Sequence, residues 1–167
     1  MRGSKGANMA KFSQKTLTQV AGFDGQILAQ ELVYLQQDFW NMAWKNSAGA
    51  PIDFTGATLD AQIIRRTITN LEDTRTGISF DIADYPGAIA IDVTITNKVD
   101  AAGTYTLVID QSTWDLVSSD PQLDIAIDNP VCFSGRIKVS FPVVGTQPAY
   151  DEVIFLLFLV TSDGVIN

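Results

Sequence analysis

Apolar and polar residues alternate along most of the chain from about residue 31 onward. A period of two is typical of β-strands that bury one face, and the chain has no sustained helical period. The alternation predicts strands at Trp40–Trp44, Leu59–Ile63, Ile78–Ile82, Ile89–Ile95, Tyr105–Ile109, Ile125–Ile127 and Ile137–Phe141. An eighth run, Val153–Val160, is apolar on both faces, and one helical turn is predicted around Ser112–Ser118.

Many short strands separated by Gly, Pro, Asn and Asp turns predict an all-β fold. We expect an immunoglobulin-like antiparallel β-sandwich of seven to eight strands with an extended N-terminal arm. The predicted core consists of Trp40, Trp44, Leu59, Ile63, Ile91, Val93, Tyr105, Leu107, Ile137 and Val139. The segment Asp100–Tyr105 loosely matches the tyrosine corner of such sandwiches, in which the hydroxyl bonds to upstream backbone.

The run Val153–Val160 has too many apolar residues for one core. One alternating set is expected to face the core, and the other is covered either by the N-terminal segment of the chain or by a neighbouring subunit. Both alternatives stay open at this stage. We therefore take Phe155, Leu156, Leu157 and Phe158 as candidate interface residues.

The 167 residues (18.2 kDa) fit one domain with a distinct N-terminal zone. Residues 1–23 hold four basic residues and no acid, whereas the rest holds seven basic and 19 acidic residues, a net charge of −12. We predict a basic arm at 1–27 and an immunoglobulin-like β-sandwich at 28–167. The basic stretch is either a solvated tail or an arm that contacts an acidic neighbour through Lys11 and Lys15.

Residues 1–8 are set apart from the rest of the chain, because Met9-Ala-Lys-Phe also has the form of a natural start. They are interpreted as an upstream extension or a tag. We expect the segment Met9–Ile27 to lie extended and to contact another chain.

Composition argues against several classes of function. Because the chain has no histidine, Ser-His-Asp and Cys-His catalysis and His-ligated metal sites are excluded. The single cysteine, Cys132, excludes an internal disulfide and a cysteine-based zinc site. A net charge of −8 argues against a nucleic-acid partner, and the longest apolar run is too short for a membrane-spanning helix. We expect no enzyme activity, no cofactor, no metal and no membrane partner.

Three groups of residues are candidate sites. Trp40 and Trp44 lie on one strand face, which favours the core over a sugar-stacking platform. The acids at 120, 124 and 128 are four apart, which is not the spacing of a calcium loop. Arg65 and Arg66 are expected to close a strand, with Arg75 in the following loop. These arginines either form a solvated hairpin tip or bind a phosphate or a partner carboxylate.

Two stretches carry a resemblance to known proteins. The segment Asp38–Trp44 followed by Asn46–Arg66, with its bend Asp53-Phe-Thr-Gly-Ala-Thr58, resembles the opening hairpin of Ig-like modules in tailed-phage baseplate and tail proteins. From Met9 to its end the chain is similar to small virion structural proteins of cyanophages, and Asp100–Tyr105 and Phe133–Phe141 belong to that likeness. The family has no catalytic residue to carry over.

The resemblance implies a structural component of a tailed bacteriophage virion, first of all in the tail or baseplate region. Such a protein would bind other virion proteins and copies of itself, and would be assembled in the cytoplasm of the bacterial host. The alternatives are a decoration protein of the head and a carbohydrate-binding module for host recognition. Exposed tryptophans at 40 or 44 would favour sugar binding, whereas buried ones would favour the structural role.

Overall fold

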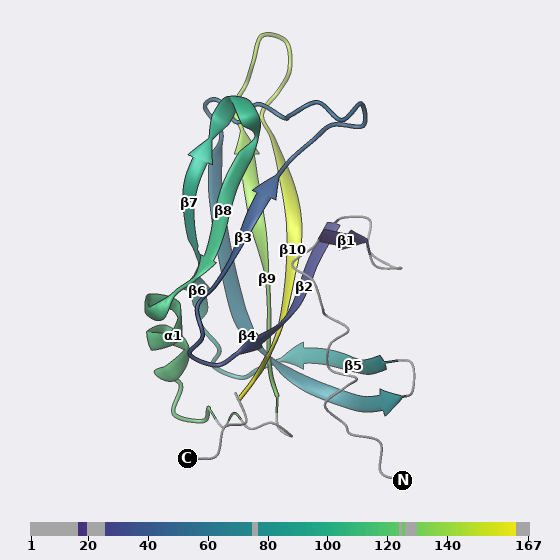
Figure 1. The fold of residues 1–167 in the computed structure, drawn as a ribbon, viewed down its shortest axis with the longest axis vertical. Coiled ribbons are helices and arrows are strands. Elements are labelled where there is room, and N and C mark those ends of the chain that lie inside the picture. The colour runs from purple at the N-terminus through teal and green to yellow at the C-terminus, as the bar shows by residue number, and fades with distance from the viewer. Residues whose placement is uncertain (1–16, 20–25, 75–76, 124, 126–129, 163–167) are drawn as a thin grey trace.

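The computed structural model describes residues 17–19, 26–74, 77–123, 125 and 130–162 (Figure 1). The described part holds ten strands, one α-helix and one 3-10 turn. The strands are β1 (Leu17–Gln19), β2 (Gln26–Val33), β3 (Asp38–Ala43), β4 (Thr58–Thr74), β5 (Gly77–Asp84), β6 (Ala90–Asp92), β7 (Thr94–Val99), β8 (Thr104–Ile109), β9 (Val131–Phe141) and β10 (Tyr150–Thr161). The 3-10 turn η2 spans Asp100–Ala102, and the helix α1 spans Gln111–Ser118.

The strands form two sheets that face each other. The larger sheet has seven strands in the order β1-β2-β10-β9-β4-β5, with β6 also paired to β4, and the smaller sheet has the order β3-β8-β7. This arrangement confirms the predicted all-β sandwich. The structure adds strands near the N-terminus that the alternation did not reveal. All pairs are antiparallel except β2 and β10, which run parallel from Gln26 opposite Ile154 to Val33 opposite Thr161.

The core lies between the two sheets and confirms the residues predicted for it. Nine of the ten are buried, and the tenth, Leu59, packs partly buried against them. The Trp40 ring stacks on Phe158 of the opposite sheet at a centroid distance of 5.4 Å. The Trp44 ring meets Phe54 edge-on at 5.7 Å. An aromatic stack therefore joins the two sheets, and a second aromatic pair packs the β3–β4 connection against the core.

The Tyr105 hydroxyl lies inside this core. It accepts a hydrogen bond from the indole N–H of Trp44 at 3.1 Å, where a tyrosine corner predicts a bond to upstream backbone. The Tyr105 side chain is buried in the core, and its partner Trp44 directly follows β3, the strand that pairs with β8. Desolvation raises the pKa of Tyr105 well above its usual value, so this hydroxyl stays neutral.

The predicted strand Ile89–Ile95 divides between the two sheets. Residues of β6 pair with β4 in the larger sheet, and residues of β7 pair with β8 in the smaller one. At the crossing point, the Val93 N–H donates to the Ala61 carbonyl at 2.8 Å. The predicted strand at Ile125–Ile127 is not seen at Ile125, which is outside any strand, and its other residues lie outside the described ones.

The predicted helical turn is the helix α1. The side chain of Asp110 caps its N-terminus by accepting the N–H of Thr113 at 3.1 Å. The helix buries Trp114 and Val117. The Trp114 indole donates to the Gln36 carbonyl at 2.7 Å, which ties the helix to the β2–β3 connection.

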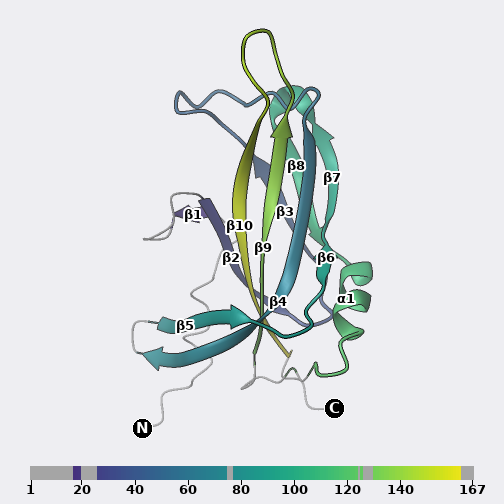
Figure 2. The ribbon, with the colours of Figure 1, turned by 180° about the vertical axis from the view of Figure 1, so that it is seen from behind.

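The β4–β5 hairpin extends beyond the sandwich. Sequence alternation predicts that the strand closes at Arg65 and Arg66, but β4 continues to Thr74 and pairs with β5 from Arg66 onward. Asn70 has a φ of 51°, and the register shifts between Thr69 and Glu72. Such an irregularity increases local twist. The hairpin leaves the larger sheet at a steep angle, at the end opposite the β9–β10 loop (Figures 1 and 2).

Candidate functional site

The doubly apolar run is β10, which lies between β2 and β9 in the larger sheet. One of its two alternating sets, which includes Leu156 and Phe158, is buried in the core between the sheets. These two residues were predicted as interface candidates. Because they are buried, a partner cannot reach them, and they stabilise the core instead of forming an interface. Phe155 and Leu157 belong to the other set and are partly buried on the outer face.

The outer face of the larger sheet is itself partly covered. Ile27, Cys132 and Leu159 are buried but do not belong to the core cluster, and Leu159 lies opposite Cys132 in the β9–β10 register. Desolvation raises the pKa of the Cys132 thiol to about 12, although the positive charge of Arg66 lowers it in part. The thiol is therefore neutral and unreactive. The N-terminal segment of the chain was one alternative for this cover. Its part Gln26–Val33 pairs beside β10 and widens the sheet, so that part does not lie over the strand.

A cavity of about 1000 Å³ opens on this outer face. We call it the outer groove. Its lining includes the apolar residues Ala29 of β2, Ile64 of β4, Phe80 and Ile82 of β5, and Phe155 and Leu157 of β10. Polar and charged residues line it as well, among them Gln62, Asp81 and Arg136. The groove exists because the hairpin turns away from the sheet, so that β5 forms a wall above the floor made by β10, β9 and β4. Its volume lies at the upper end of the range for ligand pockets.

Arg66 lies at the margin of the outer groove and is already paired. Its Nε donates to the Ser134 hydroxyl at 2.7 Å, and its guanidinium forms an ion pair with Asp84. These contacts tie the base of the hairpin to β9. The predicted binding of a phosphate or a partner carboxylate would therefore require Arg66 to give up the Asp84 carboxylate.

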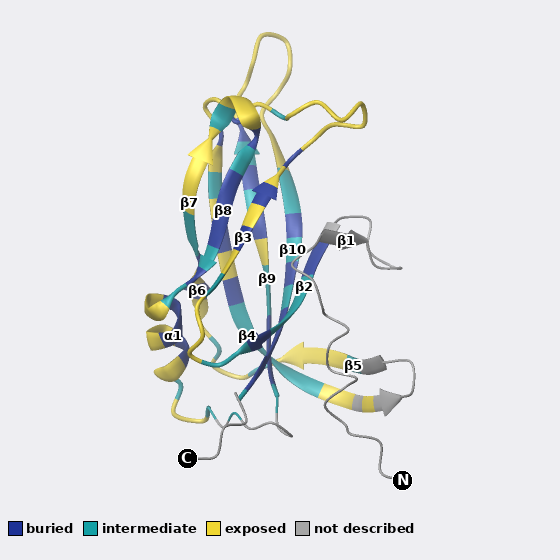
Figure 3. Ribbon diagram, in the orientation of Figure 1, coloured by how far each residue is buried: buried dark blue, intermediate teal, exposed yellow. Residues whose placement is uncertain are grey.

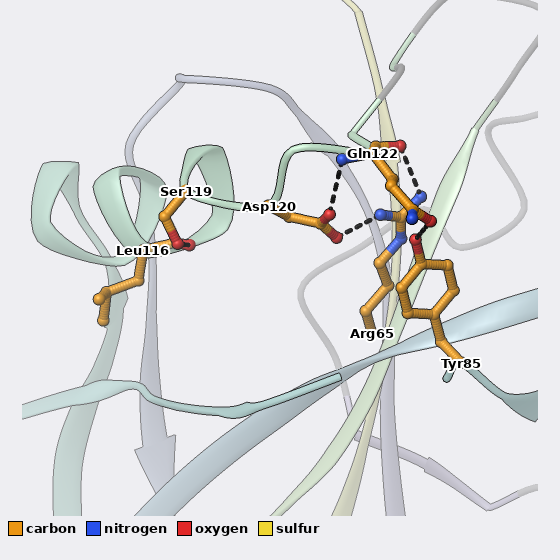
Figure 4. Close-up of polar contacts among 6 residues, drawn as sticks. All are labelled: Arg65, Tyr85, Leu116, Ser119, Asp120 and Gln122. Atoms are coloured by element: carbon orange, nitrogen blue, oxygen red, sulfur yellow. Dashed lines mark hydrogen bonds and ion pairs between the residues drawn. The ribbon is translucent and has the colours of Figure 1, made fainter. Parts of the chain in front are cut away.

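Arg65 is the centre of a second set of polar contacts, on the opposite side of β4 (Figure 4). Its guanidinium forms an ion pair with Asp120 and lies over the Tyr85 ring, 4.1 Å from the ring centroid. The Tyr85 hydroxyl donates to the Gln122 side chain at 2.5 Å, and the Gln122 N–H donates to Asp120 at 2.9 Å. The cluster fastens the loop after α1 to β4 and borders a cavity of about 260 Å³.

The polar groups of this second cavity satisfy one another. Desolvation raises the pKa of Asp120, but the Gln122 amide and the Arg65 guanidinium outweigh it and hold that pKa below its usual value. Arg65 was predicted as an interface residue. Because its charge is committed to Asp120 and to the Tyr85 ring, the geometry supports a role in holding the loop.

The predicted arm divides into described and undescribed parts. Leu17–Gln19 pairs with β2, and Gln26 and Ile27 begin β2, so these parts of residues 1–27 belong to the sheet of the domain. Lys11 and Lys15, together with Arg75, lie outside the described residues. These paired segments are extended, as predicted, and the contact of Met9–Ile27 with another chain stays a prediction.

The remaining candidate chemistry is limited. Trp40 and Trp44 expose only 2% and 8% of their surface, so neither indole can act as a sugar-stacking platform in the folded domain. Within the described residues, no three His, Cys, Asp or Glu side chains gather as metal ligands, and no helix has the length and hydropathy to cross a membrane. Of the three spaced acids, Asp120 pairs with Arg65, and the other two are outside the described part.

The hairpin wall of the outer groove is what the sequence pattern missed. Phe80 and Ile82 were predicted to lie on the apolar face of a strand, and Ile64 interrupts the alternation of β4. Together, these apolar side chains indicate a second apolar surface besides the core. The pattern does not say which face of which sheet they meet, because that depends on where the β4–β5 hairpin turns away from the sheet. Comparison with models of known protein families gives no match, and comparison with curated proteins gives none either.

Proposed function

We propose that the protein is a structural component of a tailed-phage virion, in the tail or baseplate region, and that it works through protein–protein interfaces. The outer groove is the observation that supports this function best. It is a large apolar surface on an acidic sandwich, and surfaces of that kind mark interaction sites in soluble proteins. The class of particle rests on the resemblance of the hairpin at Asp38–Arg66 to Ig-like phage modules.

The groove suits a protein partner better than an ion or a small polar ligand. Much of its floor and wall is aliphatic or aromatic, beside the charged side chains of Asp81 and Arg136, and each Å² of apolar surface that a partner covers contributes roughly 25 cal/mol. The charge of Arg66 at its margin is already balanced by Asp84. A docked apolar segment would therefore cover the groove without leaving that charge unpaired.

A decoration protein of the head would use the same interface chemistry, so the groove does not distinguish head from tail. The carbohydrate-binding alternative is not favoured, because the two tryptophans expected to form its platform lie in the core. The location in the particle is therefore the decisive measurement.

The test is to purify phage particles, identify their proteins by mass spectrometry, and locate this chain by cryo-electron microscopy. We expect density for the sandwich in the tail or baseplate. Ile82→Asp places a charge in the groove and should give a folded protein with reduced incorporation, whereas Val99→Asp, at an exposed valine on β7, should incorporate normally. Absence of the chain from purified particles would contradict the proposal.

A further inference from the structure

The loop between β9 and β10 is an exposed apolar projection. We call residues 142–149 the tip loop. Its first residues include two consecutive valines, Val143 and Val144, that expose 66% and 65% of their surface (Figure 3). None of its eight residues is charged, although charged residues make up 18% of the chain. Large apolar side chains at this exposure, at the end of the molecule, are typical of a contact surface.

The tip loop is held in one conformation by its own bonds. The Val144 N–H donates to the Gln147 carbonyl at 3.1 Å, and the Gln147 N–H donates back to the Val144 carbonyl at 2.9 Å. At its base, the Phe141 and Tyr150 rings stack at a centroid distance of 4.7 Å. A loop ordered in this way loses little conformational entropy when it binds, so its apolar surface is available for affinity.

The apolar part of the outer groove, which lies beside Asp81 and Arg136, is complementary to the tip loop in chemistry. Ile82 on the groove wall exposes 44% of its surface, and the floor includes the partly buried Ile64 and Leu157. An uncharged occupant avoids the cost of burying an unpaired charge against these residues. A volume of about 1000 Å³ is more than one side chain fills, and it suits a short loop.

Tip loop and groove wall cannot meet within one molecule. The tip loop projects beyond the strands at one end of the sandwich, and the β4–β5 hairpin leaves at the other end (Figures 1 and 2). A contact between them joins two copies of the chain. Because the two surfaces differ, it is a head-to-tail contact, which generates rings or helical arrays instead of closed dimers.

We propose that the tip loop of one copy docks into the outer groove of a second copy. This inference rests on the proposed virion function, because it names one partner of the groove as another copy of the chain. Val143 and Val144 would cover Ile82, Ile64 and Leu157. Each copy offers one tip loop and one groove, so the contact repeats from copy to copy.

The test uses the full chain and two complementary variants, Val144→Asp in the tip loop and Ile82→Asp in the groove. The molar mass of each is measured by light scattering and sedimentation up to millimolar concentration. We expect the wild type to form species larger than a dimer, and each variant to lose self-association at least tenfold. Mixing the two variants should give a heterodimer and nothing larger, because one intact tip loop and one intact groove remain.

Val99→Asp serves as the matched control, since it places the same charge at another exposed valine and should associate like the wild type. Circular dichroism confirms that each variant is folded. A monomeric wild type at all concentrations overturns the proposal, as does a variant that still associates fully or a mixture that forms large species. Presence of the chain in purified particles is a separate measurement, so failure of self-association leaves the virion function standing with a different partner in the groove.

Discussion

Gly135 in β9 is a position where the structure predicts a large effect from the smallest possible change. A Cβ atom at residue 135 would lie 1.9 Å from the carbonyl oxygen of Gln62 and 2.8 Å from the Cα of Ile63. Both atoms belong to the backbone of β4, so no side chain can rotate to make room. To reach 3.0 Å, below which Cβ contacts are essentially never found, the strands must separate by about 1.1 Å at this point.

The cost of Gly135→Ala follows from that displacement. Overpacking against side chains costs typically about 1–3 kcal/mol, and a backbone obstacle belongs at the upper end of that range. We expect unfolding free energy to fall by about 3 kcal/mol, which lowers Tm by roughly 6–12 °C in a domain of this size. Urea unfolding followed by tryptophan fluorescence measures the change.

Gly145→Ala is the control for Gly135→Ala. Residue 145 has open space around its Cβ but a φ of +59°, so alanine there costs only backbone strain of about 1 kcal/mol. The reasoning from close backbone approach is refuted if Gly135→Ala stays within about 0.5 kcal/mol of the wild type. It is equally refuted if the control is the more destabilised of the two.

Three further predictions concern the core, the helix cap and the hairpin. Trp44→Phe keeps a ring in the core but leaves the Tyr105 hydroxyl without its donor, which should cost about 1–3 kcal/mol in urea unfolding; adding Tyr105→Phe should recover part of that loss. Hydrogen bonds from Ser112, then from Thr113 and Thr94, outweigh desolvation and hold the pKa of Asp110 below its usual value. The stability they contribute is complete above the unfolded-state pKa near 3.9 and is lost as pH falls through the folded-state pKa. Asp110→Asn still caps the helix without titrating, so its unfolding free energy should fall less than that of the wild type between neutral and strongly acidic pH. Replacing residues 69–81 with an Asn-Gly turn, which joins the paired Ile68 and Ile82, should change the unfolding free energy by less than about 1 kcal/mol; complete unfolding would show that the hairpin belongs to the core.

The pattern of residues predicts the core well because burial of one strand face is recorded directly in the sequence. Trp40, Leu107 and Ile137 follow the period of two and are buried as expected. The same pattern carries no information about which strands become neighbours. The parallel pairing of β2 with β10 joins segments more than 120 residues apart, and nothing local to either segment specifies it.

The candidate site was predictable only in part, for a related reason. The double apolar character of Val153–Val160 correctly indicates a strand with two occupied faces. Whether the outer face meets the chain itself or a neighbour depends on the path of the β4–β5 hairpin. The hairpin leaves the sheet near Arg66, where the pairing of β4 passes from β9 to β5, and nothing in the alternation of this stretch marks such a change of partner.

The β4–β5 hairpin contributes little to the stability of the sandwich core, so its presence needs another explanation. Among the described residues, the core cluster includes none between Ile63 and Ile91, although 27 residues lie in that interval. Ordering such a segment costs conformational entropy on the order of 1 kcal/mol for each residue, and burial between the two sheets does not offset it. The compensating contacts include the pairing of β5, the ion pairs of Arg65 with Asp120 and of Arg66 with Asp84, and the apolar wall of the outer groove. Of these, only the apolar wall gains further stability when another chain covers it. An interface function therefore explains a feature that the folding of the sandwich alone does not require.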